Sequence, residues 1–249
     1  LHRDATVTAL EAGTAVLCEK PMATSVADCE AMIAAADRTG KLLSVGFCHR
    51  FQPHIERLRE LAQGGTLGTI LMFRNRFAGH LPGVENTWFS KRAVAGGGVM
   101  FDTAVHSVDL FRFLVGEPER VDAVAATSTT QLGPALDVED TAIMLLRSRS
   151  GVLGVIETSW RTPPGEWSVT LYGTGGSATV TYDPEELRVR LATERDWRRQ
   201  DVEPGNRFIR ELTHFLDCVR TGSPPRVTAA DGLAATTILT EAYRSSGFA

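Results

Sequence analysis

The stretch AVLCEKPMATS, residues 15–25, gives the first indication of the fold. The apolar run Val16–Cys18 predicts a short buried strand, and Glu19, Lys20 and Pro21 follow it at once. Pro21 cannot donate a hydrogen bond to a β-ladder, and its ring restricts Lys20 to extended geometry. The strand therefore ends here, with the lysine held at its rim.

The neighbouring segments complete a strand–helix–strand pattern around this stretch. Ser25-x-x-Asp28 resembles a capping box that opens a helix through about Thr39, and residues 42–47 read as a second strand. A further helix is expected before the first strand, closed by Gly13 as a left-handed cap. A βαβ unit implies parallel strands, and a parallel sheet needs both faces covered. This part looks like the trailing portion of a larger doubly wound sheet.

Beyond residue 50 the pattern changes to strands joined by turns. Helices are expected over 55–63, 99–115, 206–221 and 229–245, a long loop over 78–96, and strands over 69–77, 121–129, 140–147, 152–160, 167–173, 177–182 and 187–192. The predicted fold class is α/β plus α+β. Residues 1–49 form the C-terminal part of a Rossmann-type parallel sheet, and residues 50–249 form a domain with a large, mostly antiparallel sheet and flanking helices. Strands that read apolar on both faces predict a homodimer or homotetramer through that sheet.

The composition excludes several classes of function. The chain has 249 residues, 43% of them hydrophobic, and a net charge of −4, which argues against a nucleic-acid partner. No apolar stretch approaches the roughly 18 residues that a membrane span needs. Four cysteines without C-x-x-C spacing predict reduced thiols in a cytoplasmic protein, and the scattered histidines predict no metal site.

Lys20 is the first candidate for chemistry. In an open parallel sheet, ligands bind outside the carboxyl ends of the strands, and Lys20 is expected at such an end. A lysine there can act as an acid or base, or polarise a hydroxyl group. From its position alone, it can equally be a surface lysine at the end of a strand.

A second candidate is GGGVMFDTAVHSVDLFRFLVG, residues 96–116. The three glycines permit close backbone approach just before a helix. On that helix Asp102 and His106 are four residues apart and should share a face, where a carboxylate beside an imidazole can handle protons. An ordinary polar contact on a helix face explains the same spacing.

Together the two motifs carry a resemblance to a known family. In this order along the chain, CEKPMA, SVGFCHRFQP, AGGGVMFDTAVHSVDLFRFLVG, VEDTAIMLLRSRSGVLGVIETSW and LYGTGGSATV resemble the Gfo/Idh/MocA family of nicotinamide-dependent oxidoreductases (glucose–fructose oxidoreductase, inositol dehydrogenase, rhizopine catabolism). The resemblance runs over essentially the whole chain.

The resemblance implies a site and a reaction. Catalysis is assigned to Lys20, Asp102 and His106, with Lys20 and His106 handling the proton. The cofactor, NAD or NADP, is expected near Glu19, Lys20, His2 and Arg50. The substrate, a sugar, inositol or related polyol, is expected near the catalytic residues and near Trp88 and His80, on the loop that shapes the pocket. The implied reaction is hydride transfer between the nicotinamide and a carbinol carbon.

Other functions remain open from the sequence. Some relatives are glycosidases that use NAD transiently, and others are non-catalytic dinucleotide-binding sensors; an inactive fragment is a further alternative. The glycine-rich phosphate loop G-x-G-x-x-G is absent from these 249 residues. The chain therefore resembles a member that lacks the first part of its nucleotide-binding domain, and we expect it to bind NAD(H) weakly in a calorimetric titration.

Overall fold

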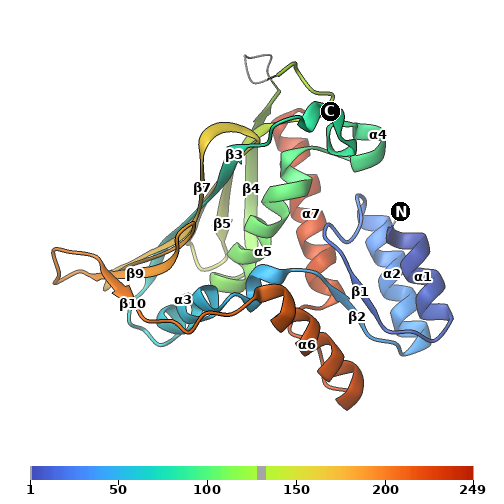
Figure 1. Cartoon of the computed structure of the whole chain (residues 1–249), viewed down its shortest axis with the longest axis horizontal. Helices are drawn as coiled ribbons and strands as arrows, with labels where there is room; N and C mark the ends of the chain where they lie inside the picture. The colour runs from blue at the N-terminus through green and yellow to red at the C-terminus, as the bar shows by residue number, and fades with distance from the viewer. Residues whose placement is uncertain (1, 128–132, 249) are drawn as a thin grey trace.

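A computed structural model of the protein describes residues 2–127 and 133–248. Leu1 and residues 128–129, the end of the strand predicted over 121–129, lie outside the described residues. The molecule contains a small and a large β-sheet, and helices α5 (Val105–Leu114) and α7 (Ala229–Ser246) lie between them (Figure 1).

The N-terminal unit is the predicted βαβ arrangement, preceded by a helix. Its elements are α1 (His2–Glu11), β1 (Val16–Cys18), α2 (Val26–Thr39) and β2 (Leu43–Val45). β1 and β2 pair in parallel. The Ser25 hydroxyl accepts a hydrogen bond from the Asp28 amide at 3.1 Å, as expected of an N-cap, and Gly40 closes α2 in the left-handed region with φ 65°.

The large sheet has eight strands in the order β10-β9-β8-β7-β3-β6-β5-β4. Among the described residues of this sheet, only the β3/β6 pair is parallel, which confirms the mostly antiparallel sheet predicted from the sequence. The strands are β3 (Ile70–His80), β4 (Pro118–Ala126), β5 (Thr141–Ser148), β6 (Leu153–Ser159), β7 (Arg161–Gly173), β8 (Gly176–Tyr182), β9 (Glu185–Leu191) and β10 (Arg198–Gln200).

The remaining helical segments include α3 (Pro53–Gln63) beside the large sheet and α6 (Arg207–Thr221), which projects away from it (Figure 1). The others are the 3₁₀ turns η1 (Cys48–Phe51), η2 (Val84–Asn86) and η3 (Trp88–Ser90), the helix α4 (Arg92–Ala95), and the π-helical turn η4 (Met100–Ala104) that leads into α5. The capping box predicted for α7 is present, with Thr228 and Asp231 bonding reciprocally. Among the described residues, no helix combines the length and apolar character needed to cross a bilayer.

The structure differs from the sequence-based expectation in three places. The loop predicted over 78–96 contains the end of β3 and the short helical turns η2, η3 and α4. β7 begins at Arg161 rather than at 167, because Pro163, Pro164 and Gly165 are weak strand formers that hide its first half. β10, three residues long, has too little alternation to be detected.

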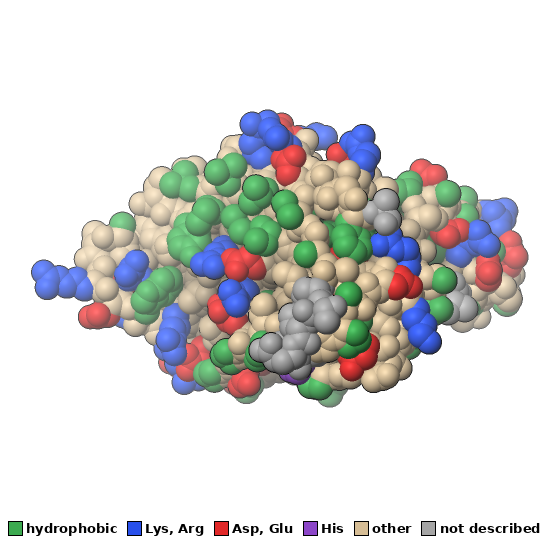
Figure 2. Space-filling view, turned by 90° about the horizontal axis from the view of Figure 1, so that it is seen from above, with side chains coloured by type: hydrophobic (Ala, Val, Ile, Leu, Met, Phe, Trp, Pro, Cys, Tyr) green, Lys and Arg blue, Asp and Glu red, His purple; other side chains and the backbone are tan. Residues whose placement is uncertain are grey.

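The two faces of the large sheet differ in what covers them. The inner face packs against α5, where Phe111 lies so close to Gly154 that a Cβ there would meet its ring at 2.7 Å. The register places Val124 of β4, Ile143 and Leu145 of β5 and Leu153 of β6 on the opposite face, each at least half exposed. In the view of Figure 2, the largest group of hydrophobic side chains lies left of the centre of the molecule.

A buried ion-pair network ties η1, α5 and α7 together. The Arg50 guanidinium contacts Asp109 at 2.5 Å and Asp231 at 3.0 Å, and Arg112 contacts Asp231 at 2.9 Å. Burial raises the pKa of the Asp109 carboxyl to about 6, and the charge and hydrogen bonds of Arg50 oppose that rise. The network fixes the chain after β2 to the helices that carry the rest of the site.

Replacing Asp109 by alanine should destabilise the fold by about 3–5 kcal/mol, because it leaves the Arg50 charge buried without its closest partner. The measurement is urea unfolding at pH 7. Asp217→Ala is the matched control, since Asp217 is 54% exposed in a surface pair with Arg220 and should lose less than about 1 kcal/mol. Equal losses in the two variants would contradict the stabilising role of the network.

Candidate active site

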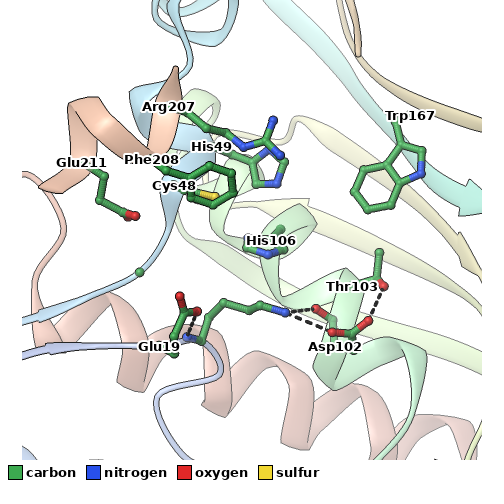
Figure 3. A pocket seen from close by; sticks show the side chains of 12 residues that line it. Glu19, Cys48, His49, Asp102, Thr103, His106, Trp167, Arg207, Phe208 and Glu211 are labelled. Atoms are coloured by element: carbon green, nitrogen blue, oxygen red, sulfur yellow. Dashed lines mark hydrogen bonds and ion pairs between the residues drawn. The ribbon is translucent and has the colours of Figure 1, made fainter. Parts of the chain in front are cut away.

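Lys20 follows the carboxyl end of β1, and its side chain reaches across to Asp102, which Figure 3 shows on the helix that also carries His106. Its ammonium donates to the Asp102 carboxylate at 3.0 Å and to the Asp102 main-chain oxygen at 2.8 Å. The two residues are 82 positions apart in the chain. Both side chains are mostly buried, at 20% and 24% exposure. The ion pair therefore joins the two motifs that the sequence singled out.

The glycine run allows the site helix to begin against two other segments. A Cβ on Gly98 would lie 1.9 Å from the main-chain oxygen of Glu139, and one on Gly97 would lie 2.1 Å from the Tyr243 hydroxyl. No side chain fits at either position. The Glu139 carboxylate accepts hydrogen bonds from the amides of Gly98 and Met100 at 2.9–3.1 Å. An anion is thus held at the helix N-terminus, where the helix dipole stabilises it.

The first turn of this helix is π-helical, which changes how Asp102 and His106 face each other. A π turn holds more residues than an α turn, so positions four apart are no longer stacked as the sequence predicts. The Asp102 carboxylate pairs with Lys20 and accepts from the Thr103 hydroxyl at 3.1 Å. Within the described chain, no hydrogen bond joins Asp102 to His106. The two side chains meet only in lining the same cavity.

A cavity of about 210 Å³ lies between Lys20 and the inner face of the large sheet. It is lined by Glu19, Lys20, Gly46, Cys48, His49, Asp102, Thr103, His106, Trp167, Arg207, Phe208 and Glu211. Burial, then repulsion by His49, Lys20 and Arg207, lowers the pKa of His106 well below the usual histidine range. Burial, then the charges of Arg207 and Lys20, lowers the pKa of His49 to about 3. Both imidazoles are neutral at physiological pH, so each keeps a nitrogen that can accept a proton.

A larger cavity of about 410 Å³ lies on the other side of the Lys20–Asp102 pair. His2, Glu19 and Lys20 line it from the N-terminal unit. Trp88 and Phe89 line it from the opposite side, with stacked rings 4.1 Å apart. The two cavities share Glu19, Lys20 and Asp102 in their walls. Charged groups at this shared wall can therefore contact ligands on both sides.

Two residues predicted at the site lie elsewhere. Arg50 lines neither cavity and is held in the buried network with Asp109 and Asp231. Its place at the edge of the cofactor site stays a prediction, and in this structure two carboxylates hold the guanidinium away from both cavities. His80 ends β3 opposite Arg161 and also lines neither cavity.

The structure adds residues that sequence reasoning missed. His49 follows the end of β2, so the rule that placed Lys20 at the carboxyl edge of the sheet would also have selected His49. Trp167 projects from β7 and stacks on Phe77 at 4.6 Å, and nothing in its local sequence indicates a site. Arg207 and Glu211 are four residues apart on α6, a signal no stronger than any other polar pair on a helix.

Two protein-family models match the chain, one over each of its two sheets. A model described as "GFO/IDH/MocA C-terminal domain" matches residues 55–179. A model described as "Oxidoreductase family, NAD-binding Rossmann fold" matches residues 1–47. The two matches divide the chain at the same place as the two sheets.

Individual relatives agree with this assignment. Inositol 2-dehydrogenase 3 of Saccharopolyspora erythraea is 32% identical over 249 residues, covering 95% of this chain and 69% of its own length. The 1,5-anhydro-D-fructose reductase of Ensifer adhaerens is 29% identical, covering 94% of this chain and 70% of its own. The chain thus spans about 70% of the length of these relatives.

Solved structures show the same fold. Aldose-aldose oxidoreductase from Caulobacter crescentus, complexed with glycerol, superimposes with a TM-score of 0.91 at 31% identity, covering 100% of this chain and 74% of that one. Levoglucosan dehydrogenase, in complex with NADH and levoglucosan, gives a TM-score of 0.91 at 26% identity, covering 100% and 75%. Both are oxidoreductases of sugars by name.

The buried carboxyl of Glu211 should make the stability of the fold depend on pH. Its side chain is 7% exposed and its Oε1 has no hydrogen-bond partner. Burial, and then repulsion by Glu19, raises the pKa of its carboxyl to about 7 from 4.5. Because the folded state holds this proton more tightly than the unfolded state, its contribution to stability is present below about pH 4.5 and is lost as the pH rises through about 7.

Glu211→Gln should therefore gain stability over the wild type between pH 5 and pH 8, by roughly 1–2 kcal/mol once solvent screening is allowed for. Urea unfolding at the two pH values measures the gain. Glu60→Gln, which changes an exposed acid on α3, should show the pH dependence of the wild type. A Glu211→Gln curve parallel to the wild-type curve would show that the carboxyl is not destabilised by burial.

Proposed function

The chain belongs to the Gfo/Idh/MocA family of oxidoreductases, and on that basis we propose that it transfers a hydride between NAD(P) and a carbinol carbon of a sugar, inositol or related polyol. Lys20, Asp102 and His106 carry the reaction. The single observation that supports these roles is the Lys20–Asp102 ion pair, which stands between two cavities with His106 in the wall of the smaller one. A hydroxyl in the smaller cavity is within reach of both Lys20 and His106.

The residues fit a nicotinamide cofactor at the shared wall. Glu19 and Lys20 lie at the carboxyl end of β1, the edge at which doubly wound sheets bind dinucleotides, and His2 lies beside them with its Nδ1 2.9 Å from the Pro21 carbonyl oxygen. We assign the cofactor to this edge, held by Glu19, Lys20 and His2. When bound, the nicotinamide supplies the hydride acceptor or donor.

The protein's own groups handle the proton and the charge. In the oxidative direction, the imidazole of His106 accepts the hydroxyl proton. Its lowered pKa keeps the ring unprotonated at physiological pH. The Lys20 ammonium donates to the substrate oxygen and stabilises the negative charge that develops there. Asp102 keeps Lys20 oriented and balances its charge. In the reductive direction the same groups return the proton.

The division of labour between the two parts of the chain follows from the same assignment. Residues 1–49 belong to the nucleotide-binding unit, and residues 50–249 form the substrate-binding and oligomerisation domain. The aromatic surface of Trp88 and the exposed part of Trp167 (39%) offer stacking faces to the apolar side of a sugar ring.

We further propose that two copies pair through the outer face of the large sheet. Val124, Ile143, Leu145 and Leu153 present apolar side chains there, with exposures of 50–74%. Beside it, Glu157 is already paired with Arg74 and Arg76 on the same face. A two-fold axis can place this patch against the same patch of a second copy, since an isologous interface uses one surface of each subunit twice.

The catalytic assignment is tested by a dehydrogenase screen on the full-length protein, with sugars and polyols against NAD and NADP. Lys20→Ala and His106→Ala should each lower kcat by about 10²–10⁴-fold on the best substrate, because each removes a proton-handling or charge-stabilising group. Lys91→Ala, an exposed lysine, is the control and should match the wild type. Wild-type rates in both site variants would overturn the assignment, and glycoside hydrolysis without net NADH would replace the dehydrogenase with the glycosidase alternative.

The interface is tested by light scattering. The wild type should give at least the mass of a dimer, and Leu145→Glu should give a monomer at the same concentration, because a carboxylate on this apolar face cannot be desolvated at an interface. Leu81→Glu, which changes a 39%-exposed apolar residue in the loop after β3, should keep the wild-type mass. A monomeric wild type would reject the interface.

A further inference from the structure

We propose that Cys48, His49 and His106 form a binding site for a borderline divalent transition metal, with Zn²⁺ as the best match, and that the bound ion blocks the smaller cavity. The binding itself rests only on geometry. The inhibitory consequence rests on the function proposed above. The scattered histidines predicted no metal site, because His106 lies far along the chain from Cys48 and His49.

The three donor atoms converge on one point. One donor atom from each residue lies within 4.8 Å of the other two. Cys48 and His49 open η1 directly after β2, and His106 stands on α5. In a tetrahedral zinc site, with bonds of about 2.0–2.3 Å, donor atoms lie roughly 3.3–3.7 Å apart. The donors must therefore approach one another by about an ångström when the ion binds. One thiolate and two imidazoles are a ligand set that zinc prefers.

The two imidazoles are oriented as metal ligands usually are. The Nδ1 of His49 is paired with the Tyr182 hydroxyl at 2.7 Å, which leaves Nε2 available. This is the outer contact that typically fixes the ring of a metal-binding histidine. The Nδ1 of His106 is buried and has no hydrogen-bond partner among the described residues. The two ring centroids lie 4.5 Å apart, edge to face.

Charged groups of both signs line the cavity around the three donors. Three carboxylates line it, those of Glu19, Asp102 and Glu211, against the two cations Lys20 and Arg207. Asp102 already holds Lys20. The ion therefore meets charges of both signs, and Arg207 must move its charge aside from Cys48, with which it interacts.

Binding exchanges one proton for the metal. Both imidazoles are already neutral, so only the Cys48 S–H bond breaks, its proton passing to solvent as the metal–sulfur and two metal–nitrogen bonds form. The metal displaces this proton as the metal–sulfur bond forms. Three protein ligands leave a fourth position open to the cavity, where water can coordinate.

A bound ion would compete with the substrate. Coordination occupies the lone pair with which His106 accepts a proton, and the ion fills part of a cavity of about 210 Å³. Zn²⁺ should therefore inhibit the full-length enzyme in a manner competitive with the sugar or polyol, and EDTA should restore the rate.

The decisive measurement is X-ray absorption of the wild-type chain loaded with one equivalent of Zn²⁺. We expect a first shell with one sulfur at about 2.3 Å and two imidazole nitrogens at about 2.0 Å. With Co²⁺ in place of Zn²⁺, we expect the visible bands of tetrahedral cobalt and a thiolate-to-cobalt charge-transfer band. A zinc shell without sulfur, or an octahedral cobalt spectrum, would overturn the proposal. Neither readout needs an active enzyme or a variant.

Variants then locate the site. Cys48→Ser should remove the charge-transfer band and weaken Zn²⁺ binding by at least about 100-fold, more than the loss of an outer-shell partner costs. Cys29→Ser is the matched control. Cys29 is a buried cysteine on α2 whose thiol contacts Thr236 of α7, and this variant should bind Zn²⁺ as the wild type does. An unchanged band in Cys48→Ser would reject the assignment. Zn²⁺ binding with this signature in a protein that fails every dehydrogenase assay would keep the site and reject the proposed function.

Discussion

The close packing of α7 against both β-sheets is the constraint on which the site depends. Near its start, a Cβ on Gly232 would lie 2.7 Å from the Met22 sulfur and 2.8 Å from Val45, so only glycine allows the helix this close to the small sheet. Further along, the same helix packs on β4 of the large sheet. Met22 is two residues after Lys20. The helix therefore fixes how far the Lys20 turn stands from the domain that carries Asp102.

The far end of α7 also sets where Asp102 lies. The Tyr243 hydroxyl contacts the Glu139 carboxylate and accepts from the Gly98 amide at 3.1 Å, while its ring stacks on Phe101 at 5.3 Å. Burial raises the pKa of the Glu139 carboxyl, and the hydrogen bonds from Tyr243 and the main-chain amides oppose that rise. One helix thus holds both partners of the Lys20–Asp102 pair, one through Met22 and the other through the glycine run.

A structural feature could be predicted from the sequence where it depends only on neighbouring residues in the chain. The ends of α2 and α7 follow from their caps, and the strand ending at Glu19-Lys20-Pro21 follows from proline chemistry, so these were readable from neighbouring residues. The π turn at Met100–Ala104 was not, because it depends on Glu139 and Tyr243, which lie far away in the chain. Trp167 reaches the cavity only because β7 pairs with β3 in one particular register.

Arg50 shows what such a local signal leaves open. Its place after the last strand of a parallel sheet is the same kind of signal that selected Lys20, yet two carboxylates from α5 and α7 hold it within the core. Position along a strand decides that a side chain reaches the ligand edge. It does not decide whether a charged residue on another helix forms an ion pair with that side chain. Such partners cannot be identified from the neighbouring sequence, because the fold brings them together.

Burial gives the smaller cavity two possible chemistries from one set of groups. An imidazole kept neutral by its surroundings is suited to accept a proton from a substrate hydroxyl, and the same neutrality makes it a metal donor. What separates the two uses is the neighbouring charge. A Lys20 ammonium favours a substrate oxygen that becomes negative, whereas a divalent ion is favoured only where Glu19 and Glu211 outweigh that ammonium. The balance of these charges, rather than the histidines themselves, sets which ligand the cavity takes.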